Sequence, residues 1–198
     1  MILSIMRIWD LNIFKNYQSI FNINPLYLIS MKRLFFTSLI LFTLTISNGS
    51  AFAACNDSAQ PFVDWQRCIF DGQNLESLSL DKANIKDSSF VRANLSYAIF
   101  RRVNAYRAKF ISATMNYSTF YESIFLDADF TKANLENSNF SKTDLRNAIF
   151  VNANLKNVNF TDANITRADF KGADLSGATW KDGETICAEG SIGRCNSK

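Results

Sequence analysis

Histidine is absent from this 198-residue sequence, and only two prolines and seven glycines are present. Histidine is the commonest general base of enzymes and the commonest metal ligand, so its absence argues against most hydrolytic and metal-dependent active sites. The few glycines form no phosphate-binding loop, and the carboxylates recur along the chain without gathering into a catalytic pair. We therefore expect a protein that is not an enzyme and that binds no cofactor or metal.

Glycine and proline are both missing between Gln73 and Lys171, where they would mark inserted loops. What this stretch has instead is an apolar residue at every fifth position, 23 times without exception from Phe70 to Trp180. A step of five rotates a side chain by about 140° around an α-helix, and in a strand it changes the face, so neither element could bury all these positions. The chain must turn once in every five residues.

A second inward position lies two residues before each apolar centre and is alanine in 13 of 23 cases. The centres also repeat at a spacing of twenty, with phenylalanine at 70, 90, 110, 130, 150 and 170 and leucine or methionine at the positions five residues later. This longer period predicts four units per coil, with like side chains stacked in columns. We expect Ala105 to leave room for Phe125. On the outside of the coil, we expect a charge ladder of Asp87, Arg107 and Asp127 and a stack of Tyr97 on Tyr117.

The triplet Ala-Asn-Leu occurs at 93–95, 133–135 and 153–155, and Ala-Asp-Leu occurs at 173–175. These triplets resemble the A(D/N)LXX consensus of the pentapeptide repeat family, over residues 68–181. The resemblance implies an all-β fold, a right-handed quadrilateral parallel β-helix of about six coils, about 28 Å long at the usual strand spacing.

The N-terminal 53 residues differ from the repeats. Lys32 and Arg33 follow Met31 and precede a mostly apolar run at 34–46, and Ala51-Phe52-Ala53 supplies a cleavage site, as in a secretory signal peptide. The apolar run is shorter than the roughly 20 residues of a membrane span. We predict translation from Met31, cleavage after residue 53 and export to the periplasm or beyond, with a retained N-terminal membrane anchor as the alternative. Residues 54–67 and 182–198 would then cap the rod at its two ends.

All four cysteines lie outside the regular repeats, at Cys55, Cys68, Cys187 and Cys195. A disulfide needs Cα atoms within about 7 Å, so a rod of the expected length allows only Cys55 with Cys68 and Cys187 with Cys195. Residues 52–55 also resemble a bacterial lipobox faintly, which would make Cys55 a lipid anchor instead. A four-thiolate zinc site is disfavoured because no Cys-x-x-Cys spacing is present.

Charge patterning offers one candidate interaction surface. Five basic residues lie close together in sequence and predict a basic belt around the rod: Arg92, Arg101, Arg102, Arg107 and Lys109. Simple solvation of the rod is the alternative interpretation.

The best-known members of the resembled family are cytosolic quinolone-resistance rods that mimic DNA and bind gyrase. From Ala54 onward this chain has 17 basic and 17 acidic residues, so it lacks the negative charge of a DNA mimic and the positive field of a nucleic-acid binder. We predict a non-enzymatic exported scaffold or interaction module that contacts an unidentified protein or envelope component, as a monomer or a homodimer. Modulation of a topoisomerase such as gyrase and action as a secreted bacterial effector are the alternatives.

Overall fold

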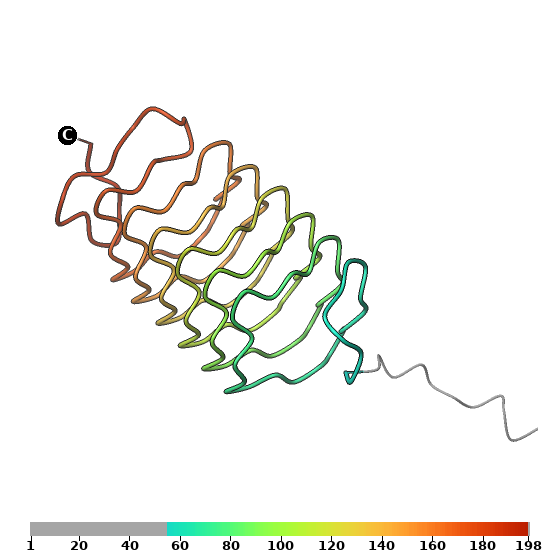
Figure 1. Ribbon diagram of the computed structural model, residues 1–198. Helices are drawn as coiled ribbons and strands as arrows, with labels where there is room; N and C mark the ends of the chain where they lie inside the picture. The colour runs from blue at the N-terminus through green and yellow to red at the C-terminus, as the bar shows by residue number, and fades with distance from the viewer. Residues whose placement is uncertain (1–54, 198) are drawn as a thin grey trace, which may run out of the picture. The chain divides into compact units, whose positions relative to one another are not determined.

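The computed structural model describes residues 55–197, so the predicted signal peptide from Met31 to residue 53 and the extension before it lie outside the described residues. Residues 61–180 wind into a coil with a roughly square section (Figure 1). The described part of the chain has no helix and no strand longer than one residue, because each unit of five consists of a two-residue turn and a single bridging residue. Parallel bridges join residues twenty apart, from Asp64 with Asn84 to Asn159 with Thr179. The predicted twenty-residue coil is therefore confirmed.

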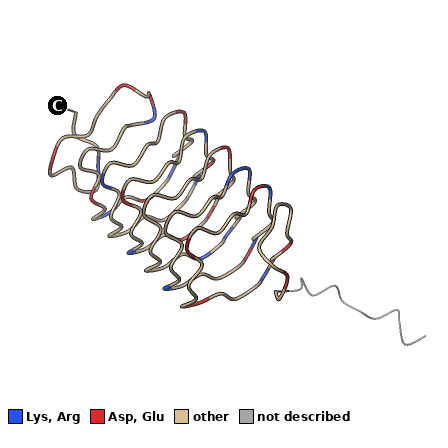
Figure 2. Ribbon diagram, in the orientation of Figure 1, with Lys and Arg blue, Asp and Glu red and all other residues tan. Residues whose placement is uncertain are grey.

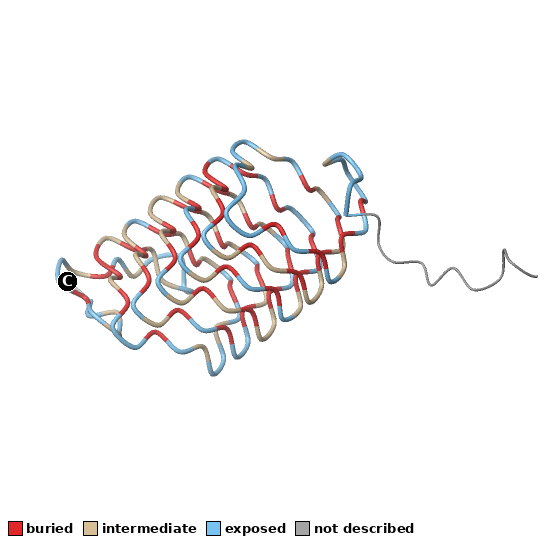
Figure 3. Ribbon diagram, turned by 90° about the horizontal axis from the view of Figure 1, so that it is seen from below, coloured by how far each residue is buried: buried red, intermediate tan, exposed pale blue. Residues whose placement is uncertain are grey.

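The four sides of the coil are named by the apolar centres that they carry. Side A carries the column from Phe70 to Phe170, side B the column from Leu75 to Leu175, side C the column from Leu80 to Trp180, and side D the column from Trp65 to Ile165. Buried and exposed residues alternate along each side (Figure 3). The centre and the residue two before it point inward, and the bridging residue between them points outward.

Each unit is tied to both neighbouring coils by its backbone. In the unit 103–107, the N–H groups of Ala105 and Arg107 donate to carbonyls of the next coil at 2.8 and 3.0 Å. Asn104 donates in the opposite direction, to a carbonyl of the preceding coil at 3.0 Å. The turn is closed by Ala108, whose N–H donates to the carbonyl of Ala105 at 3.0 Å.

The other two N–H groups of the unit, those of Val103 and Tyr106, are satisfied by side chains. Val103 donates to the hydroxyl of Ser123 at 2.9 Å, and the bond of Tyr106 explains the Asn or Asp of the consensus. The carboxamide oxygen of Asn104 accepts from the N–H of Tyr106 at 3.3 Å. Asp129 does the same for Thr131 at 2.9 Å, and Asn159 for Thr161 at 2.9 Å. Because these side chains reach two residues ahead, all five backbone donors of such a unit are bonded, as buried donors require.

The second turn residue of every unit has a positive φ, as in Arg102 at 55° and Asn147 at 57°. This conformation costs an ordinary residue roughly 1 to 2 kcal/mol and is prohibitive for β-branched side chains. Accordingly no valine, isoleucine or threonine occupies this position from residue 62 to residue 177, whereas the first turn residue includes Val91, Ile111 and Thr131.

The interior is filled by stacked rings. Along side A, successive phenylalanine centroids from Phe70 to Phe170 lie 4.9 to 5.2 Å apart with nearly parallel planes. The shorter column on side C meets these rings edge to face, as Phe120 does with Phe130 at 6.4 Å. Both arrangements are favourable for aromatic pairs.

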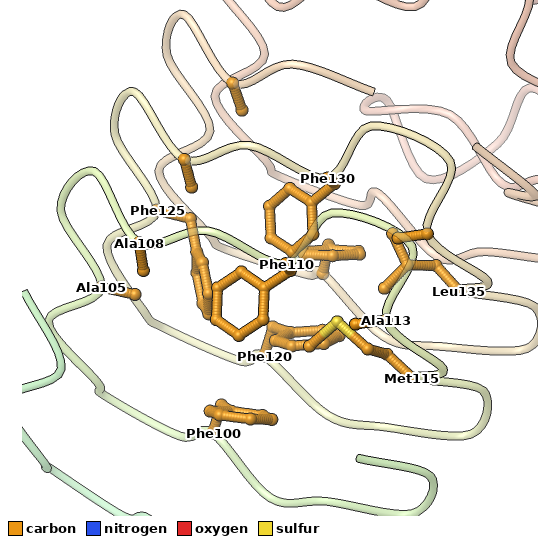
Figure 4. Packing of buried hydrophobic residues seen from close by; sticks show 14 of the residues in the cluster. Phe100, Ala105, Ala108, Phe110, Ala113, Met115, Phe120, Phe125, Phe130 and Leu135 are labelled. Atoms are coloured by element: carbon orange, nitrogen blue, oxygen red, sulfur yellow. The ribbon is translucent and has the colours of Figure 1, made fainter. Parts of the chain in front are cut away.

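Phe125 stands alone between the two columns, as predicted from its neighbour Ala105. Its ring lies 5.8 Å from Phe110 and 6.3 Å from Phe100, which belong to the same coil as Ala105 (Figure 4). Both Phe125 and Ala105 are fully buried. Ala105 thus leaves the space that the ring of Phe125 occupies.

The ends of the array differ from the prediction that every fifth residue is buried. Leu75, Ile165 and Trp180 are only partly buried, and Gln73, at an inward position of the first coil, is exposed. These residues lie in the terminal coils, where no further coil stacks on them. Conversely, the array starts before the expected residue 68, since Val63 and Trp65 are buried at inward positions.

Hydroxyl groups at the small inward position are bonded across coils. Ser118 donates to the carbonyl of Leu95 at 2.7 Å and accepts from the N–H of Ala98 at 3.2 Å. Thr143 donates in the same way to Phe120 at 2.7 Å. Ser138 occupies the equivalent position, but its hydroxyl is buried without a hydrogen-bond partner in the described structure.

Ser118→Ala and Ser138→Ala are therefore expected to change stability in opposite directions. Loss of the bonded Ser118 hydroxyl should lower the free energy of unfolding by about 1 kcal/mol, while loss of the unpaired Ser138 hydroxyl should leave it unchanged or raise it by about 1 kcal/mol. Urea unfolding of the two variants checks this difference. Equal destabilisation by both would contradict the hydrogen-bond assignment.

Candidate interaction surface

Some of the outward side chains form polar ladders, in which they bond to their equivalents in the next coil. On side B, Asn94 donates from its carboxamide to Asn74 at 2.9 Å, and Asn154 donates to Asn134 at 3.0 Å. Such ladders stabilise the stack, and they leave few side-chain groups of side B free to select a partner.

Apolar side chains interrupt the polar surface at a few places. The exposed large apolar residues of the described chain are Phe62, Ile69, Tyr97, Ile99, Tyr117, Ile124, Ile149, Ile186 and Ile192. Three of them lie together at the start of side C in two adjacent coils. Tyr97 and Tyr117 stack at 5.1 Å with nearly parallel rings, as predicted, and each ring remains 51% exposed. Ile99 follows Tyr97 on the same side.

Two arginines and a third tyrosine complete this surface at the other end of side C. Arg101 lies 3.9 Å and Arg102 lies 3.1 Å from the carboxylate of Asp81, and both guanidinium side chains are about half exposed. Tyr121 follows in the next coil and accepts a hydrogen bond from Lys142 at 3.2 Å.

We name this set the tyrosine–arginine surface: Tyr97, Ile99, Arg101, Arg102, Tyr117 and Tyr121. Tyrosine and arginine are the side chains most enriched among residues that dominate binding energy at protein interfaces. The sequence predicts only that Tyr97 stacks on Tyr117, and it indicates no role for Ile99 or Tyr121. The available signal was an isoleucine at an outward position that is otherwise mostly polar.

The predicted basic belt is distributed over several sides of the coil. Arg101 and Arg102 lie side by side in sequence at the corner after side C, and Arg107 lies at the corner after side D. Lys109 is the outward residue of side A, and Arg92 lies at the corner that follows side A. Basic and acidic residues are both distributed along the coil (Figure 2). Arg107, Lys109 and Arg92 therefore follow side A from one corner to the other in two adjacent coils, whereas Arg101 and Arg102 lie at the corner after side C, so the five residues form no single belt.

The predicted charge ladder is present in its first step. Arg107 donates to Asp87 at 2.8 Å, and the negative charge of Asp87 raises the pKa of the Arg107 guanidinium. The predicted second step, from Arg107 to Asp127, is not among the contacts of the described residues, and Asp127 instead accepts a hydrogen bond from Asn147 at 2.8 Å. These contacts occupy Arg107 with a neighbour and make it a weaker candidate for binding an external anion.

The cysteines pair as predicted. Cys55 and Cys68 form a disulfide with Cα atoms 5.5 Å apart, and Cys187 and Cys195 form one with Cα atoms 4.9 Å apart. Cys68 and Cys187 are buried, so both bonds are anchored in the ends of the rod.

The C-terminal tail takes the place of a further coil over sides B and C. The N–H groups of Leu175 and Trp180 donate to tail carbonyls at 2.8 and 2.7 Å, where interior coils would use the next coil. The tail runs antiparallel to the coil, with bridges from Asp174 to Ile192 and from Thr179 to Ile186. It therefore covers half of the terminal edge, which would otherwise invite pairing with other strands.

No set of three or more potential metal ligands is gathered within residues 55–197. The same part of the chain contains no helix that is long and apolar enough to cross a membrane.

Comparison with known proteins gives the following similarities. Residues 88–125 match the family described as "Pentapeptide repeats (8 copies)", and residues 123–195 match the "Pentapeptide repeat region". Among curated proteins there is no match.

Solved structures with similarity to the chain include QnrB1, a plasmid-mediated fluoroquinolone resistance protein, at 22% identity and a TM-score of 0.37. That alignment covers 62% of this chain and 66% of QnrB1, which is slightly less than two thirds of its length. HetL, involved in heterocyst differentiation in the cyanobacterium Nostoc, is 22% identical over 65% of this chain and 67% of its own, with a TM-score of 0.28. Rfr23 from the cyanobacterium Cyanothece is 19% identical, with a TM-score of 0.40, and the alignment covers 60% of this chain and 90% of Rfr23.

The turn that leads into the tail predicts a pH dependence. Asp182 accepts from the hydroxyl and N–H of Thr185 and from the N–H of Glu184, and these bonds lower the pKa of its carboxyl. The pKa of the Asp182 carboxyl in the folded protein lies below the unfolded value of about 3.9. The stability that ionised Asp182 contributes to the folded turn is therefore fully present above that value, and it is lost as the pH falls through the folded pKa. The protection factor of the Thr185 amide, which is corrected for the intrinsic pH dependence of exchange, should fall over that range, and Asp182→Ala should abolish this fall. Unchanged pH dependence in the variant would contradict this anchoring role.

Proposed function

The chain belongs to the pentapeptide repeat family, and on this premise we propose that it is an exported, non-enzymatic interaction module that binds a protein or envelope component through the tyrosine–arginine surface. We also take its coil to be right-handed, with about six turns, as in a quadrilateral parallel β-helix built on strands about 4.8 Å apart. The observation that carries the proposal is the adjacency of two half-exposed stacked tyrosines, Ile99 and two half-exposed arginines on one side of a rigid rod.

The architecture of the rod favours binding over catalysis. The interior is packed with fully buried phenylalanine and leucine side chains, and the shaft carries no inserted loop between Gln73 and Lys171. Perturbed carboxylates of the kind that catalysis uses generally require a cleft that excludes water. The lowered pKa of Asp144 is instead caused by its hydrogen bonds and charge pairing with Arg146, beside it on the surface.

Rigidity also suits the proposed surface to binding. Tyr97 and Tyr117 sit on a turn whose N–H groups donate to the next coil at 3.0 Å in both cases, so their positions are fixed before a partner arrives. Tyrosine side chains lose little rotamer freedom on binding, and a pre-organised surface avoids part of the entropic cost of association.

Export is supported by the two disulfides, which persist in oxidising compartments and are rare in the cytosol. The similarity to QnrB1 keeps gyrase as an alternative target, and action as a secreted effector would use the same surface on a host protein. A neutral rod is less suited than an acidic one to imitate DNA, so the envelope partner is preferred.

Capture of the partner in cells tests the proposal. The double variant Tyr97→Asn with Tyr117→Asn should stay folded, because asparagine tolerates the positive φ of both positions. The amount of partner that is cross-linked to it should fall at least tenfold. Arg92→Asn with Ser112→Asn is the matched control, since it changes the same turn position of the same two coils at a different corner. The measurement is mass spectrometry of cross-linked complexes from separated periplasmic and cytosolic fractions.

Retention of partner capture by the tyrosine double variant would contradict the assignment of the surface. Recovery of the protein from the cytosol with gyrase and with its leader intact would contradict export and support the alternative.

A further inference from the structure

The tripeptide Asn-x-Ser/Thr, the acceptor motif of N-linked glycosylation, recurs along the rod. Within residues 55–197 it occurs six times, with its asparagine at positions 56, 94, 116, 139, 159 and 164. Four of these asparagines are bridging residues whose side-chain oxygen accepts from the N–H two residues ahead. The motif alone does not make a site, because an enzyme must also reach a side-chain nitrogen that no other group holds.

The interior coils withhold four of the six motifs. Asn94 donates from its Nδ2 to the preceding coil at 2.9 Å. In the motif at position 116, the hydroxyl of Ser118 is buried and donates to a main-chain carbonyl at 2.7 Å. Asn139 and Asn159 are half-buried, and each bridges a residue of the following coil. An enzyme would have to open the stack to reach these positions.

Asn164 lies at the open end of side D, in the last coil. Both Asn164 and Thr166 of its motif are exposed. Asn164 bridges Asp144 of the preceding coil, and no bridge of the described residues joins it to a following one. Within residues 55–197 its Nδ2 donates no hydrogen bond, since only its oxygen is bonded. The nitrogen of Asn164 is therefore both accessible and unoccupied.

The turn after Asn164 also prepares its side chain for reaction. Its Oδ1 accepts from the N–H of Thr166 at 3.2 Å and from the hydroxyl of Thr166 at 2.7 Å. Both bonds stabilise negative charge on Oδ1, which develops when Nδ2 gives up a proton and becomes a nucleophile. The exposed motif at Asn56 lacks this arrangement, because no hydrogen bond joins Asn56 to Ser58 within the described residues.

We propose that Asn164 is the acceptor of an N-linked glycan. The donor is an oligosaccharide carried on a polyprenyl diphosphate, and an oligosaccharyltransferase catalyses the transfer. A bond forms between Nδ2 and the anomeric carbon of the first sugar, while the bond from that carbon to the diphosphate oxygen breaks. The diphosphate leaves with the electron pair, and the Nδ2 proton passes to a base of the enzyme. This inference rests on the proposed export, because the modification belongs to secreted proteins.

The surroundings of Asn164 leave room for a bulky group. The C-terminal tail covers sides B and C, whereas side D is uncovered within the described residues. The N–H of the neighbouring residue, Ile165, has no backbone partner there. A glycan is bulky and hydrophilic, so it fits at this edge without displacing a coil. It would also hinder strands of other molecules from pairing with the open half of the rod.

Mass spectrometry of the protein purified from fractionated native cells tests the proposal. Trypsin releases residues 157–167, which contain the motifs of both Asn159 and Asn164, so Asn159 is an internal control. Fragmentation of this peptide should place one glycan on Asn164 and none on Asn159. Thr166→Ser keeps the motif and should keep the glycan, whereas Thr166→Val should lose it. Valine suits this turn position, since it occupies the equivalent position at 91 and 151.

An unmodified Asn164, a glycan on Asn159 instead, or a glycan that persists in Thr166→Val would overturn the proposal. The N-terminus of the same sample separates this failure from failure of the proposed function. An unmodified chain that begins at residue 54 would leave export standing without glycosylation, whereas an unmodified cytosolic chain with its leader intact would overturn both. Thermal unfolding checks that the variants are folded, and Asn164→Gln supplies a second variant that should lose the glycan.

Discussion

Backbone hydrogen bonding between successive coils, at fixed offsets of nineteen and twenty-one residues, is the constraint on which the rest of the structure depends. Ala105 donates to Ile124 and Asn104 donates to Ala83, and the same two offsets recur from the first coil to the last. A residue inserted at any point would disrupt both offsets at once. This explains why like side chains meet in columns and why the shaft tolerates no loop.

The sequence requirements of a unit follow from this constraint. An Asn or Asp before the centre bonds the one N–H that no coil reaches, and an unbranched residue at the second turn position permits the positive φ. Alanine or serine two residues before the centre leaves space for a phenylalanine such as Phe125. Each position of the five-residue unit therefore has its own physical requirement, and the family consensus combines these requirements.

Patterns that repeat could be predicted, because a five-residue frame and a twenty-residue column leave only one arrangement of the interior. The disulfide pairing could also be predicted, since it depends on rod length alone. The two ends could not, because the exposure of Leu75 and Gln73 depends on what covers them. The tyrosine–arginine surface was missed for a related reason: Tyr117 and Tyr121 join Tyr97, Ile99 and the two arginines only through coil stacking, and Ile99 looks ordinary in a sequence rich in isoleucine. The orphaned hydroxyl of Ser138 has no sequence signal, since bonded and unbonded hydroxyls occupy the same repeat position.

A rigid lattice of this kind separates function from folding. Side chains at outward positions can vary without disturbing the interior, so a binding surface can arise on one side while polar ladders hold the others.

The most direct test of the central claim compares two deletions by urea unfolding. Removal of residues 101–120 takes out one whole coil and keeps both hydrogen-bond offsets, so the shorter rod should unfold cooperatively with nearly the stability of the full rod. Removal of Asn104 alone shortens every offset that spans this position by one residue, so the bonds between the coils on either side of it lose their register. It should cost several kcal/mol or abolish cooperative unfolding. A single-residue deletion that proves as stable as the twenty-residue deletion would contradict the account.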